Sequence, residues 1–155
     1  MKSTVNNPDH SLPYHLRGAF RGFETALARY LETIGVPLSY FHILRLQWDG
    51  NGSSQLALAT KAFMTESVAS QVVKKMVKDG LLRRVRDPND KRVWLVHLTA
   101  KGKRLREKIV VDGIKISNEH AADLSREDAL ITIEVLKKIR LAFDKYNNDY
   151  KLGKT

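Results

Sequence analysis

Apolar and polar residues alternate with helical spacing over several stretches of this chain. In residues 12–34 the apolar positions recur about every 3.5 residues, which predicts an amphipathic helix that ends at Gly35 and Pro37. These positions are Leu16, Phe20, Phe23, Leu27, Tyr30 or Leu31, and Ile34. Residues 1–11 are mostly polar, and we expect them to be disordered or loosely attached.

Two shorter helices are predicted next. Ser39 is the expected N-cap of the first. Its apolar side carries Phe41, Leu44 and Trp48. The Asp-Gly-Asn-Gly run at 49–52 is a strong turn signal, after which Ser54 is expected to cap a third helix that ends near residues 61–63. Its apolar residues are Leu56, Leu58 and Ala59.

A fourth helix follows Thr65, which is its expected N-cap, and ends at Asp79 and Gly80. Four apolar residues at i, i+3, i+4 and i+7 predict its buried face. They are Ala69, Val72, Val73 and Met76.

A β-hairpin is predicted after this helix. Residues 81–86 and 93–98 are rich in strand-forming residues, and the Asp-Pro-Asn-Asp run at 87–90 is typical of a turn. A helix followed by a hairpin with a long loop is the outline of a winged helix.

Two long helices complete the predicted fold. Thr99 is the expected N-cap of the fifth helix, and Gly113 inside it is a candidate bend. Its apolar side carries Leu105 and Ile109. Ser125 and Asp128 resemble a capping box that opens the sixth helix. Its predicted inward residues are Ile133, Leu136, Ile139, Phe143 and Tyr146.

Positive charge is concentrated in one part of the chain. Residues 61–108 contain fourteen Lys or Arg and five Asp or Glu, a balance of +9 out of +10 for all 155 residues. A basic block inside an otherwise neutral chain is expected of a surface that meets phosphates. The chain is long enough to bury a sizeable core in one domain or two intertwined lobes.

Several classes of function are disfavoured. The chain has no cysteine, which excludes disulfides and thiol-based sensing. It shows no signal peptide and no apolar run of about 18 residues, so we expect a soluble, cytoplasmic protein. We find no catalytic motif and expect neither an enzyme nor a cofactor. The histidines are too scattered to predict a metal site. They are His10, His15, His42, His97 and His120.

The polar face of the fourth helix is the candidate for reading base sequence. Ser67, Gln71, Lys74, Lys75 and Lys78 are predicted to project outward, with Val68 and Ser70 on the flanks. Gln can pair with adenine, Ser with either type of base edge and Val with a thymine methyl group, while Lys neutralises phosphates. The capping residues Ser54 and Thr65 are added to the candidate DNA-binding set. An ordinary solvated helix face is the simpler alternative for this element alone.

The hairpin strengthens the case for DNA. Arg84, Arg86, Lys91 and Arg92 gather near its tip, where long cations can enter a minor groove. Asp90 is expected to hold the Arg92 guanidinium. Helix and hairpin together predict double-stranded DNA as the partner, rather than a membrane surface, which would need a broad apolar face beside the lysines.

Three motifs resemble the MarR-type winged-helix repressors. They are residues 78–82 (Lys-Asp-Gly-Leu-Leu), 87–92 (Asp-Pro-Asn-Asp-Lys-Arg) and 98–102 (Leu-Thr-Ala-Lys-Gly). The match covers roughly residues 12–147, and the motifs follow one another with the family's spacing. Asn89 departs from the Arg or Glu common there, and Gln71 departs from the common Arg, so the base read there differs from that of relatives.

The resemblance implies a mainly α fold with a small β-hairpin wing, built as an intertwined helical homodimer. Residues 1–155 would form one MarR-type domain, with a winged-helix DNA-binding lobe at 38–99 and dimerisation helices at 12–34 and 104–147. Two recognition helices would then lie about 34 Å apart on a pseudopalindromic operator.

The resemblance also implies a repressor that a small aromatic carboxylate or phenolic effector releases from DNA. The residues near the expected cleft are Tyr14, His15, Arg17, Tyr40 and His42. Tyr40 and His42 can also be ordinary helix residues. The alternative function is a nonspecific architectural nucleic-acid-binding protein without effector control, which would show steep salt dependence and little site preference.

Overall fold

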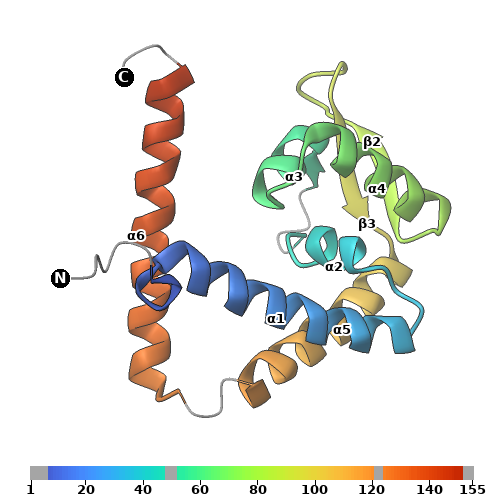
Figure 1. Cartoon of the computed structure of the whole chain (residues 1–155). Coiled ribbons are helices and arrows are strands. Elements are labelled where there is room, and N and C mark those ends of the chain that lie inside the picture. The colour runs from blue at the N-terminus through green and yellow to red at the C-terminus, as the bar shows by residue number, and fades with distance from the viewer. Residues whose placement is uncertain (1–6, 48–51, 121–123, 152–155) are drawn as a thin grey trace. The chain divides into compact units, whose positions relative to one another are not determined.

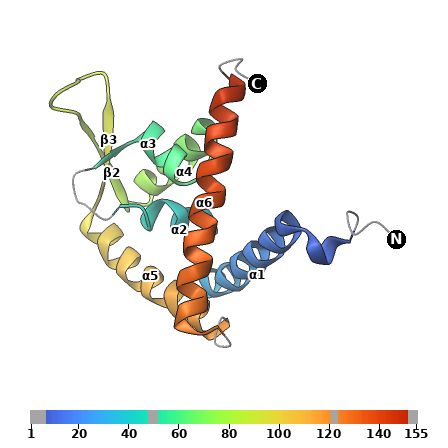
Figure 2. The ribbon, with the colours of Figure 1, turned by 90° about the vertical axis from the view of Figure 1, so that its left-hand side faces the viewer.

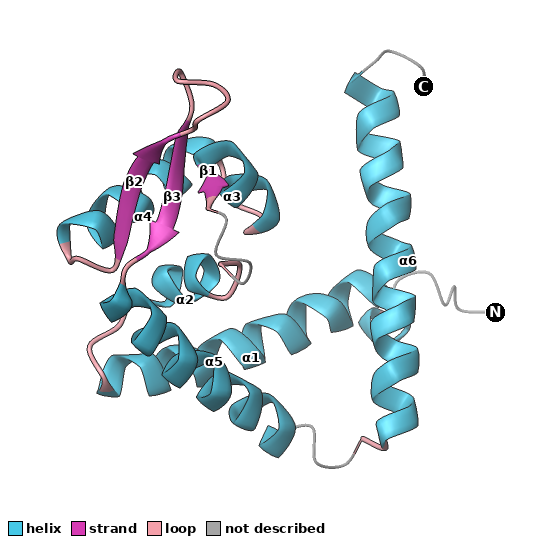
Figure 3. Ribbon diagram, turned by 180° about the vertical axis from the view of Figure 1, so that it is seen from behind, coloured by secondary structure: helices cyan, strands magenta, loops and turns pink. Residues whose placement is uncertain are grey.

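The computed structural model describes residues 7–47, 52–120 and 124–151 and is mainly helical over these ranges (Figures 1 and 3). It has six α-helices and a three-stranded antiparallel sheet. The chain divides into two compact units, residues 1–117 and 118–155, and each is described by itself. The predicted winged helix with long flanking helices is therefore confirmed as an architecture.

The first long helix, α1 (Leu12–Thr33), is preceded by the single turn η2 (Pro8–His10). Asn7 caps that turn by accepting from the Asp9 amide at 3.0 Å, and His15 Nε2 lies 2.9 Å from the Asp9 carbonyl oxygen. The expectation of a loosely attached segment was therefore wrong for residues 7–11, because local capping ties them to α1; residues 1–6 lie outside the described part of the chain.

The next helix, α2 (Leu38–Leu44), begins two residues earlier than it would with Ser39 as its cap. Pro37 occupies the N-cap position with φ −63° and makes no side-chain bond to the helix. The Ser39 prediction was wrong because proline's restricted φ already suits a helix start. Trp48 and most of the predicted turn at 49–52 lie outside the described residues.

Two capped helices follow. In α3 (Gln55–Lys61) the Ser54 hydroxyl accepts from the Ala57 amide at 3.2 Å, as predicted. In α4 (Glu66–Lys78) the Thr65 hydroxyl accepts from the Val68 amide at 3.3 Å, again as predicted. The predicted buried face of α4 is confirmed, with Ala69, Val72, Val73 and Met76 all buried.

The sheet has the order β1-β3-β2 (Figure 3). Strands β2 (Leu82–Arg86) and β3 (Trp94–Leu98) form the predicted hairpin (Figure 2). Leu82 pairs with Leu98 at the base of the hairpin, and Arg86 pairs with Trp94 near its tip. The short β1 (Ser53–Ser54) pairs with β3 and was not predicted, since two serines carry no strand pattern.

One hydrophobic core joins the helices and the sheet of residues 1–117. Its fully buried large side chains are Leu27, Leu31, Ile43, Leu44, Leu58, Val73, Met76, Leu82, Val96 and Ile109. Helices α1 and α5 (Ala100–His120) contribute to this core, so the winged helix and the long helices of this unit fold around shared apolar contacts. Gly113 of α5 lies against the Phe41 ring, where an added Cβ would approach to 3.1 Å, so close packing explains this glycine without a bend.

The last helix, α6 (Arg126–Lys151), belongs to the second unit. Ser125 caps it by accepting from the Asp128 amide at 3.0 Å and donating to the Asp128 carboxylate at 2.6 Å, which confirms the capping box. The residues predicted to face inward are largely exposed in the chain, with Phe143 at 59% and Tyr146 at 57%. Among the described residues of this unit, none covers the apolar stripe, so its burial requires contacts from outside the unit. In the described part of the chain, no helix is long and apolar enough to cross a membrane.

Candidate nucleic-acid interface

Helix α4 presents a polar face that the core does not use. Its predicted outward residues are all exposed except Ser70, which is half-buried. The exposed ones are Ser67, Val68, Gln71, Lys74, Lys75 and Lys78. Glu66 lies in the first turn of this helix, where a carboxylate is favourable against the positive end of the helix dipole. The order of small polar groups first and lysines last is therefore preserved in three dimensions.

The C-terminal end of α4 is closed by a glycine. The Gly80 amide donates to the Val77 carbonyl at 3.0 Å, and the Leu81 amide donates to the Met76 carbonyl at 2.9 Å. This Schellman pattern needs a left-handed residue at position 80, where Gly has φ +72°. The Asp-Gly-Leu sequence after α4 therefore sets where the helix ends.

The Leu-Thr-x-x-Gly motif fastens this end of α4 to α5. The Thr99 hydroxyl donates to the Gly80 carbonyl at 2.6 Å, and it accepts from the Gly102 amide at 3.1 Å as the N-cap of α5. Lys101 Nζ donates to the Asp79 carbonyl at 2.9 Å. A Cβ on Gly102 would lie 2.1 Å from the Leu81 carbonyl oxygen, so only glycine permits this approach. The motif therefore holds the end of α4 against the start of α5. In the sequence it indicated only a resemblance to a family.

A second tie to α4 comes from α2. Tyr40 is only 6% exposed, and its hydroxyl donates to the Asp79 carboxylate at 2.5 Å. Burial, together with the bond to this carboxylate, raises the pKa of Tyr40 to about 12. Tyr40 therefore fixes the C-terminal end of α4, whereas we had predicted that it lines an effector site.

The loop of the wing is ordered by its aspartates. The Asp87 carboxylate accepts from the Asn89 amide at 2.8 Å, and the Asp90 carboxylate accepts from the Arg92 amide at 2.9 Å. The predicted bond from Asp90 to the Arg92 guanidinium was wrong, because the carboxylate instead closes an Asx turn on the backbone. The side chains of Lys91 and Arg92 are exposed at this tip.

Arg86 contacts both the second strand and the loop of the wing. Its guanidinium lies 3.9 Å from the centre of the Trp94 ring and donates to the Lys91 carbonyl at 2.7 Å. A cation held over an indole and bonded to the loop backbone stiffens the hairpin. Of the four predicted wing cations, Arg84, Lys91 and Arg92 therefore present their charge to solvent, while Arg86 also shapes the loop.

The two capping residues among the predicted DNA contacts, Ser54 and Thr65, also stabilise the helices that they cap. Thr65 is exposed and Ser54 is half-buried, and each already accepts a bond from a helix amide. A hydroxyl that accepts a hydrogen bond can still donate one, so capping a helix does not prevent either side chain from donating to a phosphate.

The residues predicted to line an effector cleft do not come together. Tyr14, His15 and Arg17 border a cavity of about 580 Å³ along α1. His42 borders a different cavity, of about 360 Å³, whose lining comes from α1, α2 and the end of α3. The single-cleft prediction was wrong because three of these residues follow one helix, whereas Tyr40 is turned toward Asp79.

The second of these cavities, which we call the α1–α2 pocket, mixes aromatic and charged groups. It is lined by Phe20, Glu24, His42, Arg45, Lys61, Ala62, Phe63 and Met64. His42 Nε2 lies 3.2 Å from the Glu24 carboxylate. Burial lowers the pKa of His42 despite the opposing influence of this carboxylate. Among the described residues, no group of three or more His, Cys, Asp or Glu could hold a metal ion.

Comparison with known proteins finds a family match for the DNA-binding lobe of this chain. The model of the MarR family matches residues 36–94, which span α2 to the start of β3. The transcriptional regulator HosA of Escherichia coli O111:H- is 29% identical over 99 residues, covering 64% of this chain and 73% of that protein. The matched segment therefore contains the recognition helix and the wing.

Solved structures extend the likeness along the chain. The transcriptional regulator BldR of Sulfolobus solfataricus has a TM-score of 0.76 and 26% identity, covering 84% of this chain and 93% of BldR. CouR of Rhodococcus jostii RHA1, solved bound to p-coumaroyl-CoA, has a TM-score of 0.79 at 19% identity, covering 86% and 94%, which shows the fold alone. The segment that contains α4 and the wing is similar to the MarR family of winged-helix, DNA-binding transcriptional regulators, and the chain has the fold of BldR and CouR.

Proposed function

We propose that this chain is a homodimeric repressor that inserts α4 into the major groove and the wing into the neighbouring minor groove. The observation that carries the proposal is the exposed face of α4, fixed at its end by Thr99 and Tyr40 and accompanied in the same unit by a cationic wing. Rigid support at the end of a helix and exposed polar groups along it are what base reading requires.

The roles of the side chains follow from their positions. Gln71 is exposed in the middle of α4 and can pair with adenine, while Ser67 and Val68 are exposed near its N-terminus, where recognition helices contact bases. Lys74 and Lys78 lie further along and would neutralise phosphates. The remaining proposed contacts come from Ser54, Thr65, Ser70, Lys75, Arg84, Arg86, Lys91 and Arg92.

The dimer is proposed from uncovered apolar surface. Helix α6 exposes a series of large apolar side chains that a monomer would leave in water. They are Leu130, Ile131, Ile133, Val135, Leu136, Leu141, Phe143, Tyr146 and Tyr150. We assign dimerisation to residues 12–34 and 104–147, and DNA reading to the lobe at 38–99, all within one MarR-type domain of 155 residues. Two lobes related by a two-fold axis would then read a pseudopalindrome.

Equilibrium binding at several salt concentrations tests this function against the architectural alternative. A sequence-specific repressor should keep a large preference for its selected duplex over a scrambled one as salt rises, although affinity for both falls. A protein that loses all preference between the two duplexes at moderate salt would be a nonspecific binder, and the proposed function would be wrong.

We propose further that a small aromatic carboxylate or phenol controls the repressor through the α1–α2 pocket. Phe20 and Phe63 supply apolar walls, and Arg45 and Lys61 supply cations for a carboxylate. The volume of about 360 Å³ suits a single-ring ligand. The structural relative CouR binds p-coumaroyl-CoA, whose acyl group carries a phenol ring, which supports a phenolic ligand.

Titration of hydroxybenzoates and hydroxycinnamates into the protein–DNA complex tests the effector proposal. At least one should release DNA, and Arg45→Gln should weaken that ligand by about fivefold to tenfold, since a charged hydrogen bond is lost. Arg29→Gln, which changes an exposed cation of α1 outside this pocket, is the matched control. Equal effects of the two substitutions would reject the pocket.

A further inference from the structure

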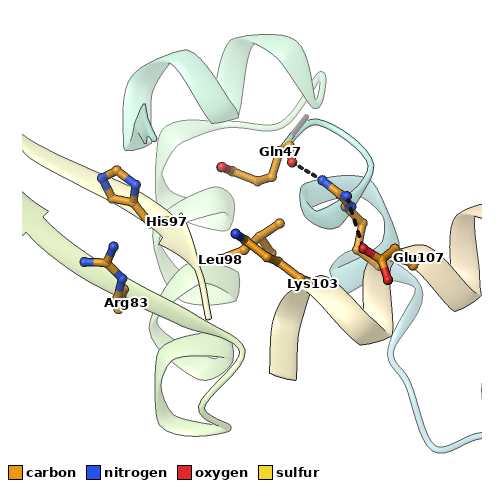
Figure 4. A pocket seen from close by; sticks show the side chains of 7 residues that line it. Gln47, Arg83, His97, Leu98, Lys103 and Glu107 are labelled. Atoms are coloured by element: carbon orange, nitrogen blue, oxygen red, sulfur yellow. Dashed lines mark hydrogen bonds and ion pairs between the residues drawn. The ribbon is translucent and has the colours of Figure 1, made fainter. Parts of the chain in front are cut away.

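A third cavity, of about 300 Å³, opens at the base of the wing (Figure 4). Its walls come from β2, β3, the first turns of α5 and the segment that follows α2. Neither the α4 face nor the α1–α2 pocket shares a residue with it. We call it the wing-base cavity.

Gln47 is the buried polar residue of the wing-base cavity. Its side chain extends into the cavity and is only 7% exposed (Figure 4). Its side-chain nitrogen Nε2 is buried and has no hydrogen-bond partner among the described residues. Buried donors in folded proteins are nearly always paired, so this nitrogen requires an acceptor that the described residues do not supply.

The groups around Gln47 favour an anionic acceptor. Lys103 and Arg83 line the cavity with exposed side chains, and Arg83 pairs directly with His97 across the hairpin. Figure 4 shows the Lys103 ammonium and the end of Gln47 directed into the same space.

The remaining charges of the lining belong to one neighbouring pair. Arg106 donates to the Gln47 backbone carbonyl at 2.6 Å and lies 3.9 Å from the Glu107 carboxylate. This carboxylate is the one acidic group of the lining, against three Lys or Arg. The formal charge of the cavity wall is therefore positive.

We propose that the wing-base cavity binds a small oxyanion, the carboxylate or phosphate group of a free metabolite. Gln47 Nε2 would donate to one oxygen, and Lys103 and Arg83 would neutralise the charge. The site is separate from the proposed DNA contacts, because successive side chains of a strand point to opposite faces and Arg83 therefore faces away from Arg84. Its occupant would bridge both strands of the wing to α5.

This position gives a bound anion a route to the DNA interface. Both strands of the wing end in the cationic loop, and the N-terminal end of α5 holds the end of α4 through Thr99. A ligand that joins these elements would stiffen the base of the wing.

Heteronuclear NMR of the full-length protein tests the proposal without DNA. Inorganic phosphate and, separately, succinate are added at constant ionic strength while the side-chain amide signals of Gln47 are followed. At least one of the two anions should shift these signals saturably, since the unpaired donor gains a charged acceptor. Which anion binds more tightly identifies the phosphate or the carboxylate as the preferred group.

Matched variants separate a site from a generally basic surface. Lys103→Gln and Arg83→Gln should each weaken the anion by about threefold to fivefold, as for the loss of one partly solvated charge. Lys108→Gln, an exposed cation of α5 outside the cavity, should change the affinity by less than about twofold.

Three results would overturn the inference. The first is no saturable shift with either anion, which would mean that the Gln47 side-chain nitrogen donates to water instead of an anion. The second is equal weakening by Lys103→Gln and Lys108→Gln. The third is displacement of the anion by a short DNA duplex, which would assign the cavity to the nucleic-acid backbone instead of a free ligand. None of these results bears on the proposed repressor function, which salt-dependent binding tests independently.

Discussion

Replacement of Gly102 by alanine should loosen the recognition helix from its support. The added Cβ would lie 2.1 Å from the Leu81 carbonyl oxygen, a separation that real Cβ contacts do not reach. The obstacle is backbone, so relief requires the first turn of α5 to move away from the end of α4. That movement strains the bonds from Thr99 to Gly80 and from Lys101 to Asp79.

The expected loss of stability can be worked from these contacts. Alanine normally stabilises a helix interior by about 1 kcal/mol relative to glycine. Overpacking costs about 1–3 kcal/mol, and two weakened hydrogen bonds cost about 1–3 kcal/mol together. Gly102→Ala should therefore lower the free energy of unfolding by about 3 kcal/mol instead of raising it.

Urea unfolding at one fixed protein concentration measures this difference, since the stability of the proposed dimer would depend on concentration. Gly18→Ala in α1 is the matched control, because nothing lies within 4 Å of its added Cβ. It should stabilise the protein by up to about 1 kcal/mol. If Gly102→Ala is as stable as the parent protein while Gly18→Ala behaves as expected, the proposed contact between the motif and α4 is wrong.

Three further substitutions test the interface and its support. Gln71→Ala should relax the preference at one base position without a general loss of affinity, as measured by selection of bound duplexes. Arg92→Ala should weaken binding by about 1 kcal/mol or more and reduce the salt slope by about 1, as measured by titration at several salt concentrations. Tyr40→Phe should change stability at alkaline pH. Because burial and Asp79 raise the pKa of Tyr40 to about 12 from 10.0, its contribution is complete below pH 10 and lost as the pH rises toward 12. Urea unfolding between pH 8 and about pH 12 should therefore show a smaller alkaline loss for the variant.

Local signals in the sequence predicted most of the fold. Ser54, Thr65, Thr99 and Ser125 all cap the helices they were expected to cap, because a cap depends on residues three positions away. The buried face of α4 followed from helical periodicity, and the hairpin followed from two runs of strand-forming residues and the turn sequence between them. These elements carry the proposed DNA interface, which is why its outline was visible in the sequence.

Contacts between distant residues were not predictable in the same way. The bond from Tyr40 to Asp79 joins residues 39 positions apart, and it removed Tyr40 from the expected effector cleft. The donor of Gln47 lacks a partner for reasons of three-dimensional packing, so no sequence pattern marks the wing-base cavity. The apolar stripe of α6 was read correctly as apolar, but periodicity cannot say which chain covers it.

Selection of bound DNA from a random duplex pool, followed by measurement of the mass of the complex, tests the central claim most directly. We expect two protein chains on a motif with two-fold symmetry, with half-sites about one helical turn apart. A single chain on the duplex, or a selected pool without a symmetric motif, would contradict it.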